Sequence, residues 1–479
     1  MEVITDLLIL SVPIIGIAVN NMLNYNPEPI FNVYQRPNGY YWFKVTLMFI
    51  VLYIKKLINN IKLALESPED LLKFYEKLEG NQELSPHKQA INAVHFNAAN
   101  KDGNHLIVGM TRRKDKLIDG YIYIKINNEE IGLLESAKLP DTTLYQSDSC
   151  EGFEAEGLSV QCIEPMKIWR IKYQGKMKKN SIPSKTFEVD LEMTYTSNFP
   201  IINYGDDSDP LTTAKCIALE RWSGEYFQLL KEYRQTQYEQ HGSIEGYAIV
   251  NGETFHLDMD SNRIRSFGNK GDWRDVHRYN LHMFSTENGD RFTVGDFCFP
   301  LTMSSFKMGF VYCAKEKRIH PITYNDFQLY QHGESGKLPS DYAFTLEAGR
   351  KTYTVKVDVI DSPHFYISKD WESEVVKRLC FFNVNSMKGW GTSECQQRNL
   401  LGRSSLERSP TLKMKNSDKK QKVHASEMIQ EERTKSLIQT NVKHVNDQKK
   451  LACEHCEKVC DSRVDLWKHL RTHDDKTKP

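Results

Sequence analysis

The sequence has no excess of charge of either sign and no regular pattern of cysteines. Among its 479 residues, 63 lysines and arginines balance 63 aspartates and glutamates, so the whole molecule has no electrostatic field that would attract nucleic acid or acidic substrates. Seven of its ten cysteines are scattered along the chain, which argues against a disulfide framework and favours a reducing compartment. We also find no Ser-His-Asp arrangement and no glycine loop of the kind that binds phosphate.

The chain also lacks a long, uninterrupted hydrophobic run. Leu7–Val19 has thirteen residues with Pro13 inside, and Tyr40–Ile54 has fifteen, interrupted by Lys44, whereas a membrane-spanning helix needs about 20 apolar residues. Three lysines follow the second stretch and resemble a cytoplasmic flank: Lys55, Lys56 and Lys62. We therefore predict that residues 1–62 form a membrane anchor or hairpin. The alternatives are two buried core helices, or a signal peptide for the first stretch.

Residues 63–84 are predicted to form a helical connector. Ser67-Pro68-Glu69-Asp70 is typical of a helix start, because the hydroxyl caps the first turn, proline fits its backbone and the two acids face the positive end of the helix.

Apolar and polar residues alternate through most of residues 85–399. Trp169, Ile171 and Tyr173 show the pattern, which predicts strands with one buried and one wet face. Asn-Gly pairs at 251–252 and 288–289 lie between such strands and predict hairpins. Many antiparallel strands indicate a barrel or sandwich. One helix is predicted among them, from Thr212 to Glu239, because aromatic residues and leucines recur there at helical spacing.

Three segments of this region resemble a known family: residues 164–177, 262–284 and 370–394. They are similar to the lipocalin-like, two-barrel family of AttH, carotenoid hydratases and fungal Diels–Alder cyclases, and more specifically to the N-terminal region of insect proteins named as phosphoenolpyruvate synthases. The resemblance covers about residues 35–399 and implies an antiparallel double barrel. The residues that fit the family pattern are Trp169, Arg170, Ser266, Gly268, Asp272, Trp273, Gly391 and Glu394.

The segments also depart from the family pattern. Ile264 and Arg265 stand where the family has an acid and an imidazole, and neither side chain does general acid–base work near neutral pH. The ATP-grasp and phosphohistidine modules that follow in the insect proteins have no counterpart after about Asn399, so phosphotransfer is not expected. The resemblance thus implies a β domain that is non-catalytic or vestigially catalytic.

A barrel of this kind can hold a small apolar ligand in its lumen. We predict a pocket lined or gated by residues around the altered motif: Arg265, Asp272, Trp273, Arg274 and His277. The alternative is structural, with an Arg–Asp pair that ties a strand end together and Trp273 in the core.

The last part of the chain changes character. Residues 400–450 hold twelve lysines and arginines against six acids and almost no aromatics, which predicts a disordered basic linker. In residues 451–479, two residues separate Cys453 from Cys456, twelve separate Cys456 from His469, and three separate His469 from His473. This is the spacing of a ββα Cys2His2 zinc finger, so we predict that these four side chains bind Zn²⁺.

The finger's partner is open between nucleic acid and protein. If it binds DNA, the expected contact residues are Ser462, Arg463, Asp465, Lys468 and Arg471. One finger buries too little surface for tight, specific DNA binding alone.

The sequence-based hypothesis is therefore a mainly β protein that acts through a zinc finger and carries a membrane-anchored, non-catalytic lipocalin-like domain facing the cytoplasm, with the nucleus as the alternative location. A second hypothesis is a small-ligand-binding or vestigial enzyme domain with an incidental finger. A third is a composite of two genes.

Overall fold

The computed structural model describes residues 24–403, except 81–82, 88–89, 149, 151, 233–235, 270–272 and 335. All helices and strands of this part belong to one compact unit. The first apolar stretch, the predicted linker beyond residue 403 and the predicted zinc finger lie outside the described residues.

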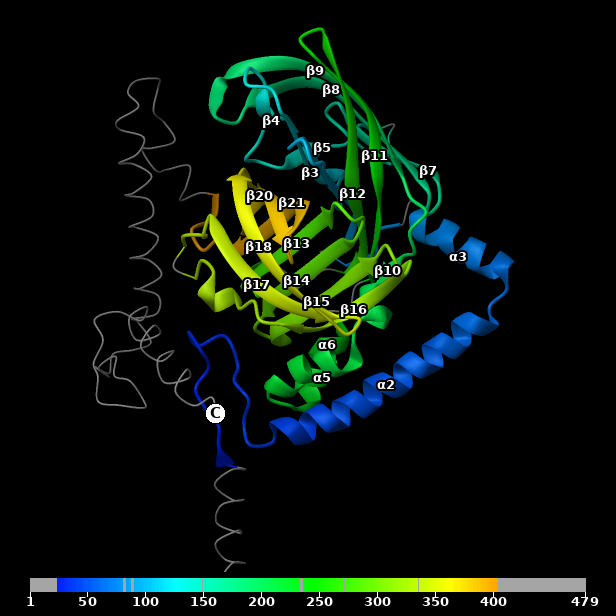
Figure 1. Ribbon diagram of the computed structural model, residues 1–479, viewed down its shortest axis with the longest axis vertical. Helices are drawn as coiled ribbons and strands as arrows, with labels where there is room; N and C mark the ends of the chain where they lie inside the picture. The colour runs from blue at the N-terminus through cyan, green and yellow to red at the C-terminus, as the bar shows by residue number, and fades with distance from the viewer. Residues whose placement is uncertain are drawn as a thin grey trace, which may run out of the picture. The chain divides into compact units, whose positions relative to one another are not determined.

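The first part of the β region forms a closed antiparallel barrel (Figure 1). Its strands are β1 (Ala90–Ala99), β2 (His105–Arg112), β3 (Leu117–Ile126), β4 (Gly132–Ser136), β5 (Thr143–Tyr145), β6 (Phe153–Ala155), β7 (Leu158–Glu164), β8 (Ile168–Lys179), β9 (Ile182–Thr196), β10 (Ile202–Asn203), β11 (Thr236–Val250) and β12 (Glu253–Asn269). The ring runs β11-β12-β1-β2-β3-β4-β8-β9, and pairing of β9 with β11 closes it. The short strands β5, β6, β7 and β10 extend it.

The second part forms another closed antiparallel ring. Its strands are β13 (Arg278–Thr286), β14 (Arg291–Phe299), β15 (Met303–Cys313), β16 (Arg318–Asn325), β17 (Asp341–Ala348), β18 (Lys351–Asp361), β19 (His364–Ile367), β20 (Ser373–Val384) and β21 (Met387–Arg398). The order is β18-β17-β16-β15-β14-β13-β21-β20, closed by pairing of β18 with β20, and β19 extends β20. The prediction of antiparallel barrels is confirmed.

Both predicted hairpins are present. Val250 pairs with Glu253 across Asn251 and Gly252, and both turn residues have positive φ, 49° and 89°. This backbone matches the twist of the flanking strands and suits asparagine and glycine. At the second turn the chain reverses between β13 and β14, where the Thr286 amide donates to the Asp290 carbonyl at 3.0 Å.

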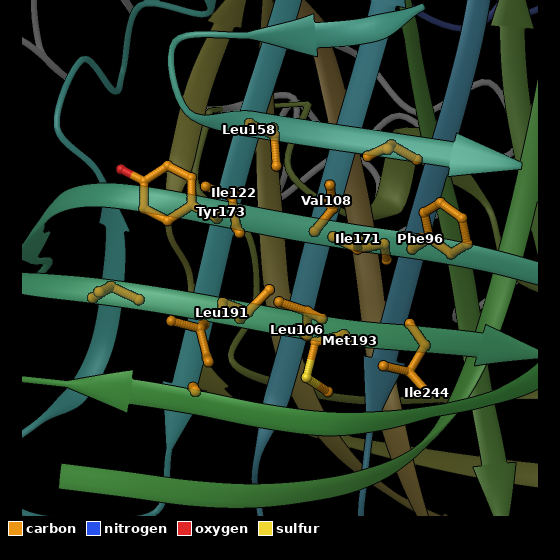
Figure 2. Close-up of a cluster of buried hydrophobic side chains, with 14 of the residues drawn as sticks. Phe96, Leu106, Val108, Ile122, Leu158, Ile171, Tyr173, Leu191, Met193 and Ile244 are labelled. Atoms are coloured by element: carbon orange, nitrogen blue, oxygen red, sulfur yellow. The ribbon is translucent and has the colours of Figure 1, made fainter. Parts of the chain in front are cut away.

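Each barrel is filled by its own core. Figure 2 shows apolar side chains from β1, β2 and β3 meeting those of β7, β8, β9 and β11 inside the first barrel. In the second barrel, Phe284 stacks on Phe292 and Phe382, with ring centroids 4.6 and 4.1 Å apart. The predicted site for a ligand, the barrel lumen, is therefore occupied by packed side chains in the first barrel.

The outer faces of the two barrels pack against each other. Ile107, Tyr121 and Tyr123 of β2 and β3 form one buried cluster with Phe365, Val375 and Leu379 of β19 and β20. The Tyr123 hydroxyl donates to the His364 carbonyl at 3.0 Å. A strand face that an isolated barrel would expose is thus covered.

The described helices lie outside the barrels. They are α2 (Tyr41–Leu65), α3 (Pro68–Glu79), α4 (Tyr204–Asp207), α5 (Pro210–Leu219) and α6 (Gly224–Glu232), with 3-10 turns η1 (Trp273–Asp275) and η2 (Leu329–Gln331). The predicted helix start at Ser67 is confirmed, because its hydroxyl accepts the Asp70 amide at 3.2 Å.

The prediction of one helix from Thr212 to Glu239 is wrong. The helix ends at Leu219, and the Glu220 carboxylate accepts the Ser304 amide at 2.7 Å, which holds Glu220 out of helical geometry. A second helix starts after Ser223, whose hydroxyl accepts the Tyr226 amide at 3.0 Å. Glu239 itself lies in β11.

The second apolar stretch falls largely in α2. Its polar side chains face α4 and α5: Lys44 Nζ donates to the Glu220 carbonyl at 2.8 Å, and Lys55 Nζ to Asp206 at 3.2 Å. Trp42 and Phe43 are 68% and 69% exposed. Among the described residues, no helix has both the length and the apolar composition needed to cross a membrane. The predicted membrane anchoring is therefore not supported.

Candidate functional site

A cavity of about 160 Å³ lies where the outer faces of the two barrels meet. Strands β1, β2, β3 and β12 form one wall, and β13, β14, β19 and β21 form the other, with η1 beside them. More than half of the lining residues are aliphatic or aromatic: Ile91, Ala93, Tyr121, Ile264, Trp273, Val276, Tyr279, Leu281, Phe297, Phe299, Phe365 and Ile367. A mostly apolar cavity with a few converging polar groups is the usual form of a small-molecule site.

One polar cluster is built on Glu394 of β21. The strand register sets Glu394 opposite Lys377 of β20 and opposite Leu281 of β13, so its side chain lies at the barrel–barrel interface. Lys377 Nζ and the Tyr279 hydroxyl both donate to the Glu394 carboxylate. Lys377 also donates to Asn97 Oδ1 of β1 at 3.2 Å. A carboxylate from the second barrel is thus tied to the first.

A second pair lies on the facing wall. His95 Nδ1 and the Tyr121 hydroxyl are 3.1 Å apart, and which of them donates depends on the imidazole tautomer. Phe365 stacks on the Tyr121 ring with centroids 4.2 Å apart, and Lys377 Nζ lies 5.5 Å from the same ring centroid. These contacts fix Tyr121 from three sides.

Burial and charge set the protonation states of these groups. Burial opposes the charged form of Glu394, but the Lys377 ammonium and the hydrogen bonds from Lys377 and Tyr279 hold its pKa below the ordinary value. Burial and the nearby Glu394 carboxylate raise the pKa of Tyr121 and Tyr279 well above the ordinary value. The cavity therefore presents an ionised carboxylate beside protonated hydroxyls at neutral pH, an arrangement suited to moving a proton and binding an oxyanion.

A third polar group lies two residues before Tyr121 on β3. The Asp119 side chain is buried and lines the cavity, and Arg113 Nε donates to its Oδ2 atom. Thr111 of β2, directly opposite Asp119, also lines the cavity.

The residues predicted to line a pocket do not gather at one place. Trp273 lines the cavity. Arg265 is fully buried, and its guanidinium donates to Asn92 Oδ1 at 2.7 Å and to the Ala93 carbonyl at 2.9 Å. His277 Nε2 lies 2.9 Å from Glu334. Asp272 and the Arg274 side chain lie outside the described residues.

Arg265 and its neighbour Arg263 hold the end of α3. Arg263 Nη1 donates to both oxygens of Glu79 at 2.6 Å, and Arg265 Nη2 donates to the carbonyls of Leu78 and Gly80 at 3.4 Å. The altered motif on β12 thus carries two guanidiniums that fasten a helix to the first barrel.

The predicted finger residues cannot be placed. The zinc ligands Cys453, Cys456, His469 and His473 and the contact residues Ser462, Arg463, Asp465, Lys468 and Arg471 lie outside the described residues. Within residues 24–403, where the structure describes them, no group of three or more His, Cys, Asp or Glu side chains could hold a metal ion.

Only part of this cavity could be predicted from the sequence. Ser266, Trp273 and Glu394, which fit the family pattern, all line it. His95, Asp119, Tyr121 and Tyr279 were not singled out. The alternation in β3 was the available signal, because Ile118 and Ile122 point into the barrel core while Asp119 and Tyr121 face outward.

Comparison with known proteins gives a family and a set of similar structures. A family model described as "Family of unknown function (DUF8627)" matches residues 8–395. No curated protein matches the chain. Among solved structures, a candidate AttH from Nitrosomonas europaea has 9% identity and a TM-score of 0.43, over 70% of this chain and 96% of that one. Kievitone hydratase from Nectria haematococca has 10% identity and a TM-score of 0.42, over 66% of this chain and 91% of that one. CghA with Sch210972 has 7% identity and a TM-score of 0.38, over 65% and 89%.

The function predicted from the sequence is wrong for the part of the chain that the structure describes. That prediction joined a membrane anchor, a bound metal and a non-catalytic β domain. The described residues contain neither a helix that could cross a membrane nor a group of side chains that could hold a metal ion, and the predicted zinc ligands lie beyond them.

Proposed function

The chain belongs to a family of unknown function (DUF8627), and we propose that its two-barrel unit is an enzyme that transfers protons on a small, mostly apolar carbonyl compound. One observation carries the proposal: an ionised carboxylate, Glu394, lies beside protonated tyrosine hydroxyls in the wall of a largely apolar cavity. Perturbed groups of this kind, gathered in a cavity, are typical of catalytic sites.

The cavity volume limits the substrate. About 160 Å³ is close to the roughly 150 Å³ of a protein cavity that binds benzene. The aromatic walls, among them Phe297, Phe365 and Trp273, suit a flat or cyclic apolar body. We therefore expect a substrate of one ring or a short chain.

Tyr121 is assigned the role of donating a hydrogen bond to the carbonyl oxygen of the substrate. When His95 Nδ1 donates to the Tyr121 oxygen, the tyrosine proton is left to donate to the ligand. Because its pKa is raised, Tyr121 keeps this proton at neutral pH. As the proton leaves the neighbouring carbon, electrons move onto the carbonyl oxygen, and a positioned donor stabilises the resulting oxyanion.

Glu394 is assigned to accept the proton. It is ionised, lines the cavity and is held by Lys377 and Tyr279. The C–H bond breaks and its proton goes to a carboxylate oxygen. That proton is replaced by one from solvent, and its transfer back to the carbon reforms the C–H bond and completes the exchange. Lys377, 5.5 Å from the Tyr121 ring centroid, adds positive charge near the developing oxyanion.

The test is deuterium incorporation beside the carbonyl of cyclohexanone in D₂O, followed by NMR. The wild-type protein is expected to accelerate incorporation above the buffer rate. Tyr121→Phe removes one oxyanion donor and is expected to lower the protein-catalysed rate about 100-fold.

Tyr145→Phe is the matched control, since Tyr145 is 60% exposed and lies outside the cavity; it should leave the rate unchanged. A wild-type rate equal to that of buffer, or equal rates for Tyr121→Phe and wild type, would show that the proposal is wrong.

A further inference from the structure

The cavity holds a buried acceptor that the proposed reaction does not use. The Asp119 side chain is 5% exposed, and Arg113 Nε donates to Oδ2. Its other oxygen, Oδ1, is buried and has no hydrogen-bond partner among the described residues. A buried carboxylate oxygen without a donor is unfavourable, so a ligand that supplies a donor there gains affinity.

The position of Asp119 relates this acceptor to Tyr121. The two residues are separated by one position on β3, so their side chains leave the same face of the strand about 7 Å apart. Both line the same cavity. A ligand whose carbonyl oxygen binds Tyr121 therefore places its opposite side near Asp119.

The charge around Asp119 selects the kind of donor. Arg113 forms an ion pair with the carboxylate, which offsets its negative charge. An ammonium group would bring a second positive charge close to the Arg113 guanidinium, and the single carboxylate is already paired. A neutral hydroxyl brings no charge and needs only the lone pairs of Oδ1. The site favours a hydroxyl over an amine.

We propose that Asp119 is a specificity residue that binds a ligand hydroxyl, so that the substrate of this cavity is a hydroxylated cyclic ketone. The proposal rests on the proposed function in one respect, the binding of the carbonyl by Tyr121. In 4-hydroxycyclohexanone the carbonyl and the hydroxyl lie on opposite sides of the ring, so this compound is a suitable probe for a cavity that Tyr121 and Asp119 both line.

The first measurement uses the wild-type protein alone. Dissociation constants for 4-hydroxycyclohexanone and 4-methoxycyclohexanone are determined by calorimetry. The hydroxyl compound donates and the methoxy compound cannot, so the wild-type protein is expected to bind the former at least tenfold more tightly. Equal dissociation constants for the two compounds overturn the proposal. The absence of detectable binding of either compound at concentrations up to roughly 10 mM overturns it as well.

The second measurement uses Asp119→Asn. Arg113 can donate only to oxygen, so it fixes the amide oxygen in the place of Oδ2 and leaves the amide NH₂ in the place of Oδ1. The acceptor becomes a donor, and the preference is expected to disappear, because the hydroxyl oxygen and the methoxy oxygen can both accept from the amide. If the role of Asp119 is purely structural, Asp119→Asn would lower the affinity for both ligands by the same factor and keep the wild-type preference, and that result overturns the proposal.

Asp148→Asn is the control, because Asp148 also forms an ion pair with a basic side chain, Lys116, but is 98% exposed; it should keep the wild-type preference. Exchange on cyclohexanone separates the two proposals. If the protein prefers the hydroxyl compound but does not catalyse exchange, the proposed reaction is wrong and the proposed binding of a hydroxyl by Asp119 is retained. If exchange depends on Tyr121 and both ligands bind with equal affinity, the proposed reaction is retained and the proposed binding of a hydroxyl by Asp119 is wrong.

Discussion

Glu394 and Lys377 form a buried cross-strand ion pair. They are directly opposite on β20 and β21, and Lys377 is 1% exposed and Glu394 14%. Lys377 also contacts the first barrel through Asn97 and the Tyr121 ring. Removing one partner from such a pair leaves a buried charge without compensation, which is more costly than removing both.

A double-mutant cycle tests the pair. Lys377→Met and Glu394→Gln are each expected to lower the free energy of unfolding by about 3 kcal/mol. The double variant should lose about 2 kcal/mol less than the sum of the two, because it leaves no unpaired charge. Urea unfolding of the four proteins gives the coupling energy.

Lys172 and Glu192 supply the matched exposed pair. They are also opposite each other, on β8 and β9, with Nζ 3.1 Å from Oε1, but are 49% and 35% exposed. Their coupling should stay below about 1 kcal/mol. Similar coupling energies for the two pairs would contradict the assignment of Lys377 and Glu394 as a buried pair.

The site could be predicted only in part, for a reason visible at single residues. Asp119 and Tyr121 alternate with buried isoleucines, and such a pattern predicts a wet outer face. Here the second barrel covers that face. Nothing in the local sequence of β3 specifies which distant strand covers it, so the cavity becomes visible only in the folded unit.

Among the elements, α3 has a role beyond connecting two segments. Its last residue, Glu79, is inserted among side chains of the first barrel: Trp169 Nε1 donates to it at 2.7 Å and the Tyr238 hydroxyl at 2.6 Å, besides Arg263. Burial opposes the charged form, but Arg263 and these donors hold the pKa of Glu79 below its ordinary value. The helix is therefore fastened by its C-terminal end.

Glu79→Ala is expected to lower the free energy of unfolding by about 3–5 kcal/mol, because Arg263 is left buried without its partner. Glu76→Ala, one helical turn earlier and exposed, should change it by less than about 1 kcal/mol. Guanidinium unfolding of both variants measures the difference. Equal losses would mean that Glu79 does not fasten α3.

Elements with local determinants were predicted, and those with distant ones were not. The Asn-Gly turns and the Ser67 cap depend on neighbouring residues and were correct. The helix breaks after Leu219, where the Glu220 carboxylate accepts a hydrogen bond from the amide of Ser304, a residue far along the chain. Helical spacing alone could not show that β11 begins at Thr236.

At the scale of the whole molecule, buried histidines of both barrels link stability to pH. Burial lowers the pKa of His105 to about 4 and of His241 and His282 to about 3. An unfolded histidine takes up its proton near pH 6.5, so between pH 6.5 and these lower values the unfolded state binds more protons. This contribution to stability is complete above pH 6.5 and is lost as the pH falls. Asp296, whose pKa burial raises to about 6, acts in the opposite sense.

His282→Gln isolates one of these contributions. Between pH 7.5 and 5.0 the wild-type protein should lose about 2 kcal/mol more of its free energy of unfolding than His282→Gln does. His256→Gln, at an exposed position, should follow the wild-type pH dependence. Urea unfolding at the two pH values measures the losses, and parallel curves for wild type and His282→Gln would contradict the assignment.

The placement of the cavity between two outer surfaces has a consequence for how relatives of this protein diverge. Each barrel keeps its own packed interior, while the cavity is lined by side chains from the opposite side of the same strands. Substitutions in the cavity lining therefore leave the hydrophobic core inside each barrel intact. Selection can change the lining of the cavity while the apolar interiors of both barrels stay the same, so members with one architecture can come to handle different molecules.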